Sequence, residues 1–253
     1  MRRGTTVLIG KLGLILLLSQ GAAVKASEIK VIASPGVAGV VTELSRQFEA
    51  ATGHKVLADF AVVAVSKRKI DAGAPFDIAI LSPEAIDDLV RQGKIAADTR
   101  AGFGRTGLGV AVRKDATRPD IGTVEAFKRT MLTAKSVGHS KEGLSGVHFM
   151  AALDRLGITA EMKPRLRTYD SGEITRGLVT GEVEVAVTGI GPILSAPELA
   201  FVGALPPELQ SHVVFTAGIS PNAKDSEATR ALLRFMTAPA ATPVFKAKGM
   251  ERD

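Results

Sequence analysis

The sequence has no cysteine, no tryptophan and a single tyrosine. Without cysteine, the chain forms neither disulfides nor thiolate metal sites, so an exported form must rely on its hydrophobic core. With so few large aromatic rings, it has little on which a base or a sugar could stack. Its four histidines are scattered and form no i, i+4 pair. We therefore expect no metal, no cofactor and no nucleic-acid partner.

The chain also has little net charge outside its N-terminal segment. The whole chain carries a formal charge of +6, but residues 1–26 contain Arg2, Arg3, Lys11 and Lys25 and no acidic residue. Subtracting these four charges leaves +2 for the remaining 227 residues. No basic run interleaved with aromatics accompanies that small excess. This balance again disfavours a nucleic-acid-binding protein.

Residues 1–26 have the order typical of a secretory signal. Two arginines precede the apolar run "LGLILLL", and a small-x-small sequence, Val24-Lys25-Ala26, follows it. The alternative is a membrane anchor, but that apolar run is well short of the roughly 20 residues that span a bilayer. We expect cleavage before Ser27 and export to the periplasm. The remaining chain is long enough for one large domain or two small ones.

Short apolar runs alternate with amphipathic segments along the first part of this chain. Strands are predicted at residues 29–33, 54–60 and 76–81, and helices at 37–51, 66–72 and 83–92. Ser82 and Pro83 have the types favoured at the start of a helix. Such β-α-β alternation is typical of a mostly parallel sheet covered by helices.

A second series of the same kind follows. Its predicted strands are residues 107–115, 134–140, 183–189, 198–205 and 211–220. Its predicted helices are residues 123–132, 146–156 and 171–181, with two more after residue 226. No low-complexity linker separates the two series, so we expect two strands to cross between them: Thr106–Val112 outward and Ser211–Ile219 back.

The predicted fold class is therefore α/β, with two lobes, each built on a mostly parallel sheet. We expect lobe I to contain residues 27–106 and 211–253, and lobe II to contain residues 107–210. Ligands of such sheets bind outside the carboxyl ends of the strands, near helix N-termini. Two lobes that face each other there would form a cleft.

Two motifs point to enzymes but lack the necessary context. "GFGRTG", Gly102 to Gly107, matches a dinucleotide-binding pattern, yet it precedes a predicted strand; we interpret it as a glycine-rich turn. "EGLSGVH" resembles a nucleophile elbow without its second glycine. A hydrolase using Ser145 is the alternative of another class, with His212 as its candidate base. The simpler interpretation has Ser145 capping a helix that starts near Gly146.

One feature recurs along the chain: corners rich in serine and glycine between a strand and a helix. They lie at residues 34–36, 82, 138–146 and 171–172. Each offers hydroxyls and backbone N–H groups without an obvious nucleophile. His139 falls in one of these corners and is a candidate for facing the cleft. Such donors are typical of a protein that holds a small polar ligand or an oxyanion without reacting with it.

Several segments resemble the molybdate-binding branch of the type II periplasmic solute-binding proteins. They are residues 29–56, 70–95, 146–158, 181–190 and 228–250, and the most specific is "AGAPFDI" at Ala72–Ile78. The resemblance covers nearly all of the chain after residue 26. It implies a type II periplasmic-binding-protein fold of two lobes that close on a ligand. It also implies delivery of a solute to an ABC-type permease in the inner membrane; we expect no catalytic activity and a monomer.

The resemblance also implies where ligand donors would lie. Molybdate-type members are expected to use a serine after each of the first two strands, backbone amides near two later helix starts, and a tyrosine after a later strand. In this sequence those positions fall on Gly36, Val63, Ser145, Ile174 and Gly189. Three side-chain donors are thus absent, and an under-bonded ion in a closed cleft is costly.

These departures favour a small polar or anionic solute that is larger or less charged than molybdate. A protein specific for molybdate or tungstate is the alternative. The predicted ligand-binding residues are Ser34, Pro35, Gly36, Val63, Ser82, His139, Ser145, Ile174 and Thr188.

Overall fold

The computed structural model describes residues 26–170 and 173–253. The predicted signal, up to residue 25, and the predicted corner at residues 171–172 lie outside the described residues. The strands are β1 (Glu28–Ala33), β2 (Lys55–Phe60), β3 (Ile78–Leu81), β4 (Ala101–Arg113), β5 (Val137–Ser140), β6 (Leu166–Tyr169), β7 (Val185–Gly189), β8 (Leu199–Ala204), β9 (His212–Ile219) and β10 (Glu251–Arg252).

Helices connect these strands, as the alternating pattern predicts. The α-helices are α1 (Ala38–Thr52), α2 (Val63–Asp71), α3 (Pro83–Arg91), α4 (Val124–Thr133), α5 (Leu144–Arg155), α6 (Thr159–Met162), α7 (Glu173–Thr180), α8 (Ile190–Leu194), α9 (Ser226–Thr237) and α10 (Thr242–Ala247). The 3-10 turns are η1 (Pro35–Val37), η2 (Ala97–Thr99) and η3 (Pro239–Ala241). None of the helices in the described ranges has the length and apolarity needed to cross a membrane.

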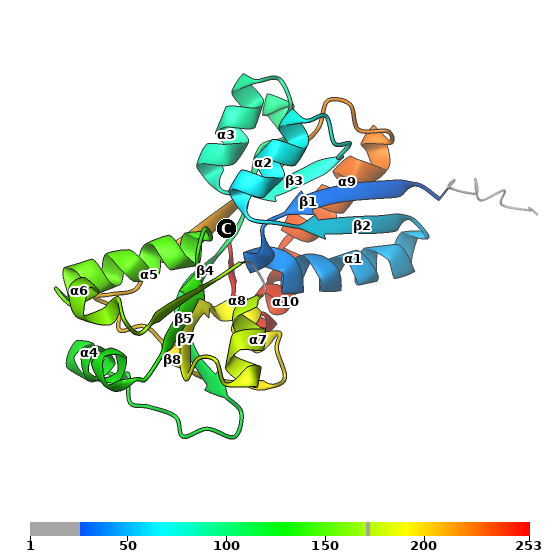
Figure 1. The fold of residues 1–253 in the computed structure, drawn as a ribbon. Coiled ribbons are helices and arrows are strands. Elements are labelled where there is room, and N and C mark those ends of the chain that lie inside the picture. Colours follow the sequence, from blue (N-terminus) through cyan, green and yellow to red (C-terminus); the bar gives the residue numbers. More distant parts are fainter. Residues whose placement is uncertain (1–25, 171–172) are drawn as a thin grey trace, which may run out of the picture.

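The strands form two lobes that share β4 (Figure 1). Along the sheet the order is β2-β1-β3-β9-β4-β7-β5-β6. β1 is parallel to β2 and β3, and β5 is parallel to β6 and β7, while β9 runs antiparallel between β3 and β4. The prediction of a two-lobed α/β fold with mostly parallel sheets is thus confirmed.

Strand β4 changes partners in its middle. Its residues 101–107 pair with β9, and residues 108–113 pair with β7 and β8. The stretch Gly102–Gly107 is therefore part of a strand, and the predicted turn was wrong. A Cβ at Gly104 would lie 2.6 Å from the carbonyl oxygen of Glu251, so the glycine lets β10 pack directly on β4.

The return crossing lies just before β9, where His212 pairs with Gly107. Here the side chain of Gln210 behaves like a strand residue. Its Nε2 donates to the carbonyl of Leu108 (2.9 Å), and its Oε1 accepts the N–H of the same residue (2.8 Å). The two crossing segments are thereby held side by side. The exact lobe boundaries, 27–106 plus 211–253 and 107–210, stay a prediction.

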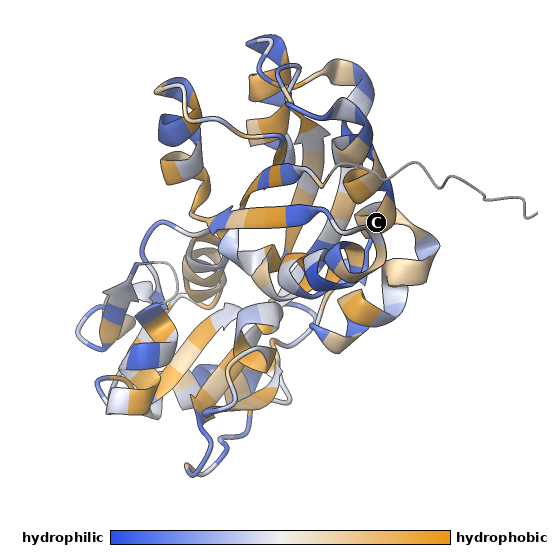
Figure 2. Cartoon of the chain, turned by 90° about the vertical axis from the view of Figure 1, so that its right-hand side faces the viewer, coloured by the Kyte–Doolittle hydropathy of each residue, from blue (hydrophilic) through white to orange (hydrophobic). Residues whose placement is uncertain are grey.

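Each lobe has its own buried core. In the first lobe, η1 and α1 bury one apolar face against the sheet, formed by Val37, Val40, Val41, Leu44 and Phe48. In the second lobe, α4 and α5 cover strands β5 and β7 in the same way. Figure 2 shows hydrophobic residues concentrated along the strands and on the helix faces beside them. These two cores hold the strand ends that form the site.

Local signals also set several helix ends. The hydroxyl of Thr123 accepts the N–H of Ala126 (3.1 Å), as expected of a cap. Helix α1 ends at Gly53, whose φ of 78° favours glycine. Strand β6 was not predicted, because it lies at the sheet edge and its residues are half-buried or exposed, which leaves no apolar alternation.

Candidate ligand-binding site

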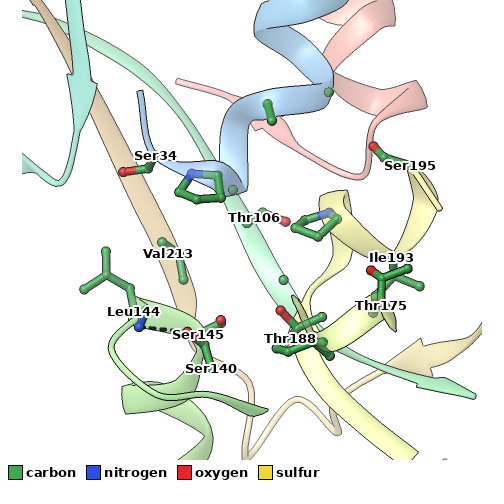
Figure 3. A pocket seen from close by; sticks show the side chains of 18 of the residues that line it. Ser34, Thr106, Ser140, Leu144, Ser145, Thr175, Thr188, Ile193, Ser195 and Val213 are labelled. Carbon is green, nitrogen blue, oxygen red and sulfur yellow. Dashed lines mark hydrogen bonds between the residues drawn. The ribbon is translucent and has the colours of Figure 1, made fainter. Parts of the chain in front are cut away.

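A cavity of about 450 Å³ lies between the lobes at the carboxyl ends of β1, β2, β5 and β7 (Figure 3). This is the place where parallel α/β sheets bind ligands. Strands β4 and β9 also contribute, through Thr106, Val213 and Phe215. Figure 3 shows Ser34 on one side of the cavity, Ser140 and Ser145 on a second, and Thr188 on a third.

The cavity brings together seven of the nine predicted ligand-binding residues. They come from five separate segments of the chain: Ser34, Pro35, Gly36, Val63, Ser145, Ile174 and Thr188. Their common location follows from the sheet, because each segment comes at or just after the carboxyl end of a strand or at the start of a helix. Contact with a ligand itself stays a prediction.

Ser82 and His139 do not line the cavity, contrary to prediction. The hydroxyl of Ser82 is buried and caps α3 by accepting the N–H of Ala85 (3.3 Å). His139 is the third residue of β5, and its ring packs on Phe149 of α5 with centroids 5.5 Å apart. Successive strand residues point to opposite faces. The residue of β5 that lines the cavity is therefore Ser140.

The imidazole of His139 lies beneath the corner that follows β5. Its Nδ1 lies 3.0 Å from the carbonyl oxygen of Ser140. Burial lowers the pKa of His139 below its ordinary value of 6.5, although the hydrogen bond to that carbonyl opposes the shift. The neutral imidazole thus supports the loop without facing the ligand.

The corner after β1 leaves one hydroxyl unused. Ser34 donates its backbone N–H to the carbonyl of Ile80 (2.9 Å), and its own carbonyl accepts the N–H of Val37 (3.1 Å). Its side chain lines the cavity and is only 5% exposed, yet within the described residues its Oγ has no hydrogen-bond partner. An unsatisfied buried hydroxyl costs about 1–3 kcal/mol. Because Ser34 lines the cavity, its hydroxyl is a candidate to bind a ligand there.

The corner after β5 is built around Ser140. Its Oγ accepts the N–H of Gly143 (2.8 Å), which fixes the turn before α5. A Cβ at Gly146 would lie 2.0 Å from the carbonyl oxygen of Ser140, so glycine lets the helix start against the strand end. Helix α5 begins at Leu144 with Gly143 as its N-cap, and Ser145 is already its second residue. The predicted capping role of Ser145 was therefore wrong.

Hydroxyls also reach the cavity from segments that the sequence did not single out. Thr175 of α7 lines it, and neither Thr175 nor Thr188 has a side-chain hydrogen bond to another described residue. Thr106 and Ser195 line it too, but their hydroxyls donate to the carbonyls of Gly249 (3.0 Å) and Gly191 (2.9 Å). Among the described residues, the hydroxyls of Ser34, Ser145, Thr175 and Thr188 thus line the cavity without a side-chain hydrogen bond and are available to a ligand.

Charge is nearly absent from the cavity wall. Of the described residues that line it, none is lysine, arginine or histidine, and Glu142 alone is charged. Over the same part of the chain, no three histidine, aspartate or glutamate side chains are placed to hold a metal ion. The cavity therefore acts through neutral hydrogen-bonding groups and through apolar contact.

Most other lining side chains are apolar. They come from both lobes and include Phe60, Val62, Val63, Leu144, Ile174, Leu178, Val213 and Phe215. Phe215 lies so close to the first corner that a Cβ at Gly36 would be 2.6 Å from its Cζ. Residues such as Phe215 carry no local sequence signal for the site, because only the pairing of distant strands brings them there.

The arrangement lacks the pair that a serine hydrolase needs. Across the described residues, no imidazole forms a hydrogen bond with Ser145. His212, the candidate base, is an exposed residue at the start of β9. A nucleophilic serine needs a base within hydrogen-bond reach. The geometry therefore gives the hydrolase interpretation no support.

The fold and cavity together are those of a solute-binding protein. Residues 29–251 match the family of bacterial extracellular solute-binding proteins, and the chain belongs to this family.

Two proteins that are similar to this chain along most of its length differ in function. An aconitate isomerase from Pseudomonas sp. is 27% identical over 251 residues, which is 95% of this chain and 94% of the relative. The molybdate-binding protein ModA of Azotobacter vinelandii is 25% identical over 90% of this chain and 91% of its own length. The solved structure of the periplasmic molybdate-binding protein from A. vinelandii covers 89% of this chain and 99% of its own, with a TM-score of 0.76 and 19% identity. The predicted resemblance to the molybdate-binding branch is thus confirmed.

Proposed function

We propose that this protein binds a small polar or anionic solute in the periplasm and delivers it to an ABC-type importer in the inner membrane. Membership of the solute-binding family supports this role, and so does the position of the cavity between two lobes. The solute would be held by the hydroxyls at the strand ends and by the first turn of α5. Strand β4 and the segment before β9 would act as the hinges for closure around it.

The observation that carries this proposal is the hydroxyl of Ser34. It is buried at the cavity wall and has no partner within the described residues. Native proteins satisfy nearly all buried polar groups. The hydroxyls of Ser45 and Thr229 are also buried without a partner among the described residues, but Ser34 differs from them in lining the cavity. A bound solute with an acceptor or donor atom would supply a partner for the hydroxyl of Ser34.

Thermal unfolding in the presence of candidate solutes tests the proposal. The panel contains molybdate, tungstate, sulfate, phosphate and small organic acids. A solute at 100 times its Kd stabilises the folded state by about 2.7 kcal/mol, which gives a clear rise in Tm. We expect one class to do so, and calorimetric titration then yields its Kd. Stabilisation by micromolar molybdate or tungstate would select the molybdate-specific alternative. No stabilisation by any class would contradict the binding role.

The similarity to an aconitate isomerase over 95% of the chain supports a second candidate function, proton transfer on a small unsaturated acid. Such an isomerisation needs a group that moves a proton. Glu142 is the one ionisable side chain among the described residues that line the cavity, so it is the candidate. Incubation with cis-aconitate, followed by NMR, tests this function. Turnover that disappears in Glu142→Gln would establish it, and absence of turnover would leave binding alone.

A further inference from the structure

The cavity has two chemically different parts. Its polar part includes the hydroxyls of Ser34, Ser145, Thr175 and Thr188, which form no side-chain hydrogen bond to another described residue. Much of the remaining wall is carbon, including the side chains of Phe60, Val62 and Val63, which follow one another at the end of β2 and the start of α2. A ligand that fills the cavity must therefore match both a hydrogen-bonding region and an apolar one.

In this arrangement of the two lobes, the cavity is larger than a tetrahedral oxyanion. At about 30 Å³ for each water, 450 Å³ corresponds to roughly 15 water molecules. A bare oxyanion displaces only a few of these. The valine and phenylalanine side chains would then stay against water and gain no contacts. An organic body would instead bury them.

The charge on the cavity wall also disfavours a multiply charged oxyanion. Glu142 carries the sole charge among the described lining residues, and no cation there offsets it. Its repulsion of a bound anion grows in proportion to the charge of that anion. A singly charged head is thus easier to accommodate than a doubly charged one, while the hydroxyls still supply hydrogen bonds.

We propose that the cavity selects a small organic acid that has one anionic head and an apolar body. The head binds the hydroxyls of Ser34 and Ser145, and the body lies against Phe60, Val62 and Val63. This inference rests on the proposed binding function and narrows it to a class of solute. It also gives the valine at position 63 a role in specificity.

Calorimetric titration with a series of straight-chain monocarboxylates, from acetate to hexanoate, tests the inference alongside sulfate and molybdate. Each buried methylene should tighten binding by about three- to fourfold. The Val63→Thr variant keeps the shape of the side chain but makes it polar, so it should weaken hexanoate binding several-fold and leave acetate binding nearly unchanged. Val214→Thr is the matched control, because Val214 is exposed on β9 and does not line the cavity.

The possible outcomes distinguish failure of the proposed selectivity for organic acids from failure of the solute-binding function. Affinity that rises with chain length, and falls in Val63→Thr but not in Val214→Thr, supports the inference. Tight binding of molybdate or sulfate, with no dependence on chain length, overturns the inference and leaves the binding function intact. If neither these probes nor the wider solute panel binds, the proposed function fails and the inference fails with it.

Discussion

Two adjacent strands of the first lobe end in the same dipeptide and use it differently. Ser34-Pro35 follows β1, and Ser82-Pro83 follows β3. Both serines have nearly the same backbone conformation, with φ and ψ of −69° and 145° for Ser34 and −65° and 154° for Ser82. Both are also buried. The hydroxyl of Ser82 caps α3, whereas that of Ser34 has no partner within the described chain.

The difference arises from the residues that follow. After Pro83 the chain enters an α-helix at once, so the N–H of Ala85 is placed to donate to Ser82. After Pro35 the chain forms the 3-10 turn η1, and α1 starts only at Ala38. The hydroxyl of Ser34 therefore does not cap a helix, and Ser34 lines the cavity. One serine serves stability, and the other is available for binding.

The largest effect that this comparison predicts is on binding by Ser34. In Ser34→Ala, a solute loses a hydrogen bond that is worth about 1.5–3 kcal/mol if the solute atom is charged, which corresponds to roughly 10- to 150-fold in Kd. The free energy of unfolding should not fall, because the hydroxyl has no partner to lose among the described residues. Calorimetric titration and urea unfolding measure the two quantities. A stability loss without a binding loss would reverse the roles assigned to the two serines.

The next effect concerns the residue two places after each serine. Gly36→Ala places a methyl group 2.6 Å from Cζ of Phe215, so we expect destabilisation of about 1–3 kcal/mol and weaker solute binding. Glu84→Ala at the equivalent position of the other corner is the control, because Glu84 is exposed. Urea unfolding of both variants gives the comparison. Equal stability of the two variants would show that the contact between Gly36 and Phe215 does not constrain the corner.

A smaller effect is expected from the cap. Ser82→Ala removes the acceptor for the N–H of Ala85 and should cost about 1 kcal/mol of stability. Solute affinity should stay the same, since Ser82 does not line the cavity. Ser82→Asp retains an acceptor at the cap and should restore most of the loss. Weaker solute binding in Ser82→Ala would instead support the prediction from the sequence that Ser82 is a ligand-binding residue.

The two corners also show what sequence reasoning can reach. Strand, turn and helix signals are local, and they sufficed to predict both corners. The use of each hydroxyl was not predictable, because it depends on whether a 3-10 turn or an α-helix follows the proline. The prediction that His139 faces the cavity was wrong for a related reason: the sequence did not show toward which face of the sheet each residue of β5 points. Phe215 and Glu142 reach the site only through long-range packing or a loop conformation.

The corner after β5 differs from both Ser-Pro corners, because a buried histidine precedes its serine. Burial lowers the pKa of His139 in the folded state below the ordinary value of 6.5. As the pH falls through about 6.5, the unfolded chain takes up a proton at this residue before the folded chain does. Stability should therefore decrease from pH 7.5 to 5.5, above the range in which carboxylates titrate.

Urea unfolding across this pH range measures the effect, which we expect to be the smallest of the four. His148 adds to it in the same direction, since burial and, to a smaller extent, Arg155 lower its pKa. The His139→Gln and His148→Gln variants separate the two contributions, and each should flatten part of the decline. If His139→Gln loses stability with falling pH as steeply as the wild type, the neutral imidazole beneath Ser140 is not what ties this corner to pH. In that case, the buried histidine would not make the corner after β5 more sensitive to acid than the two Ser-Pro corners, which contain no histidine.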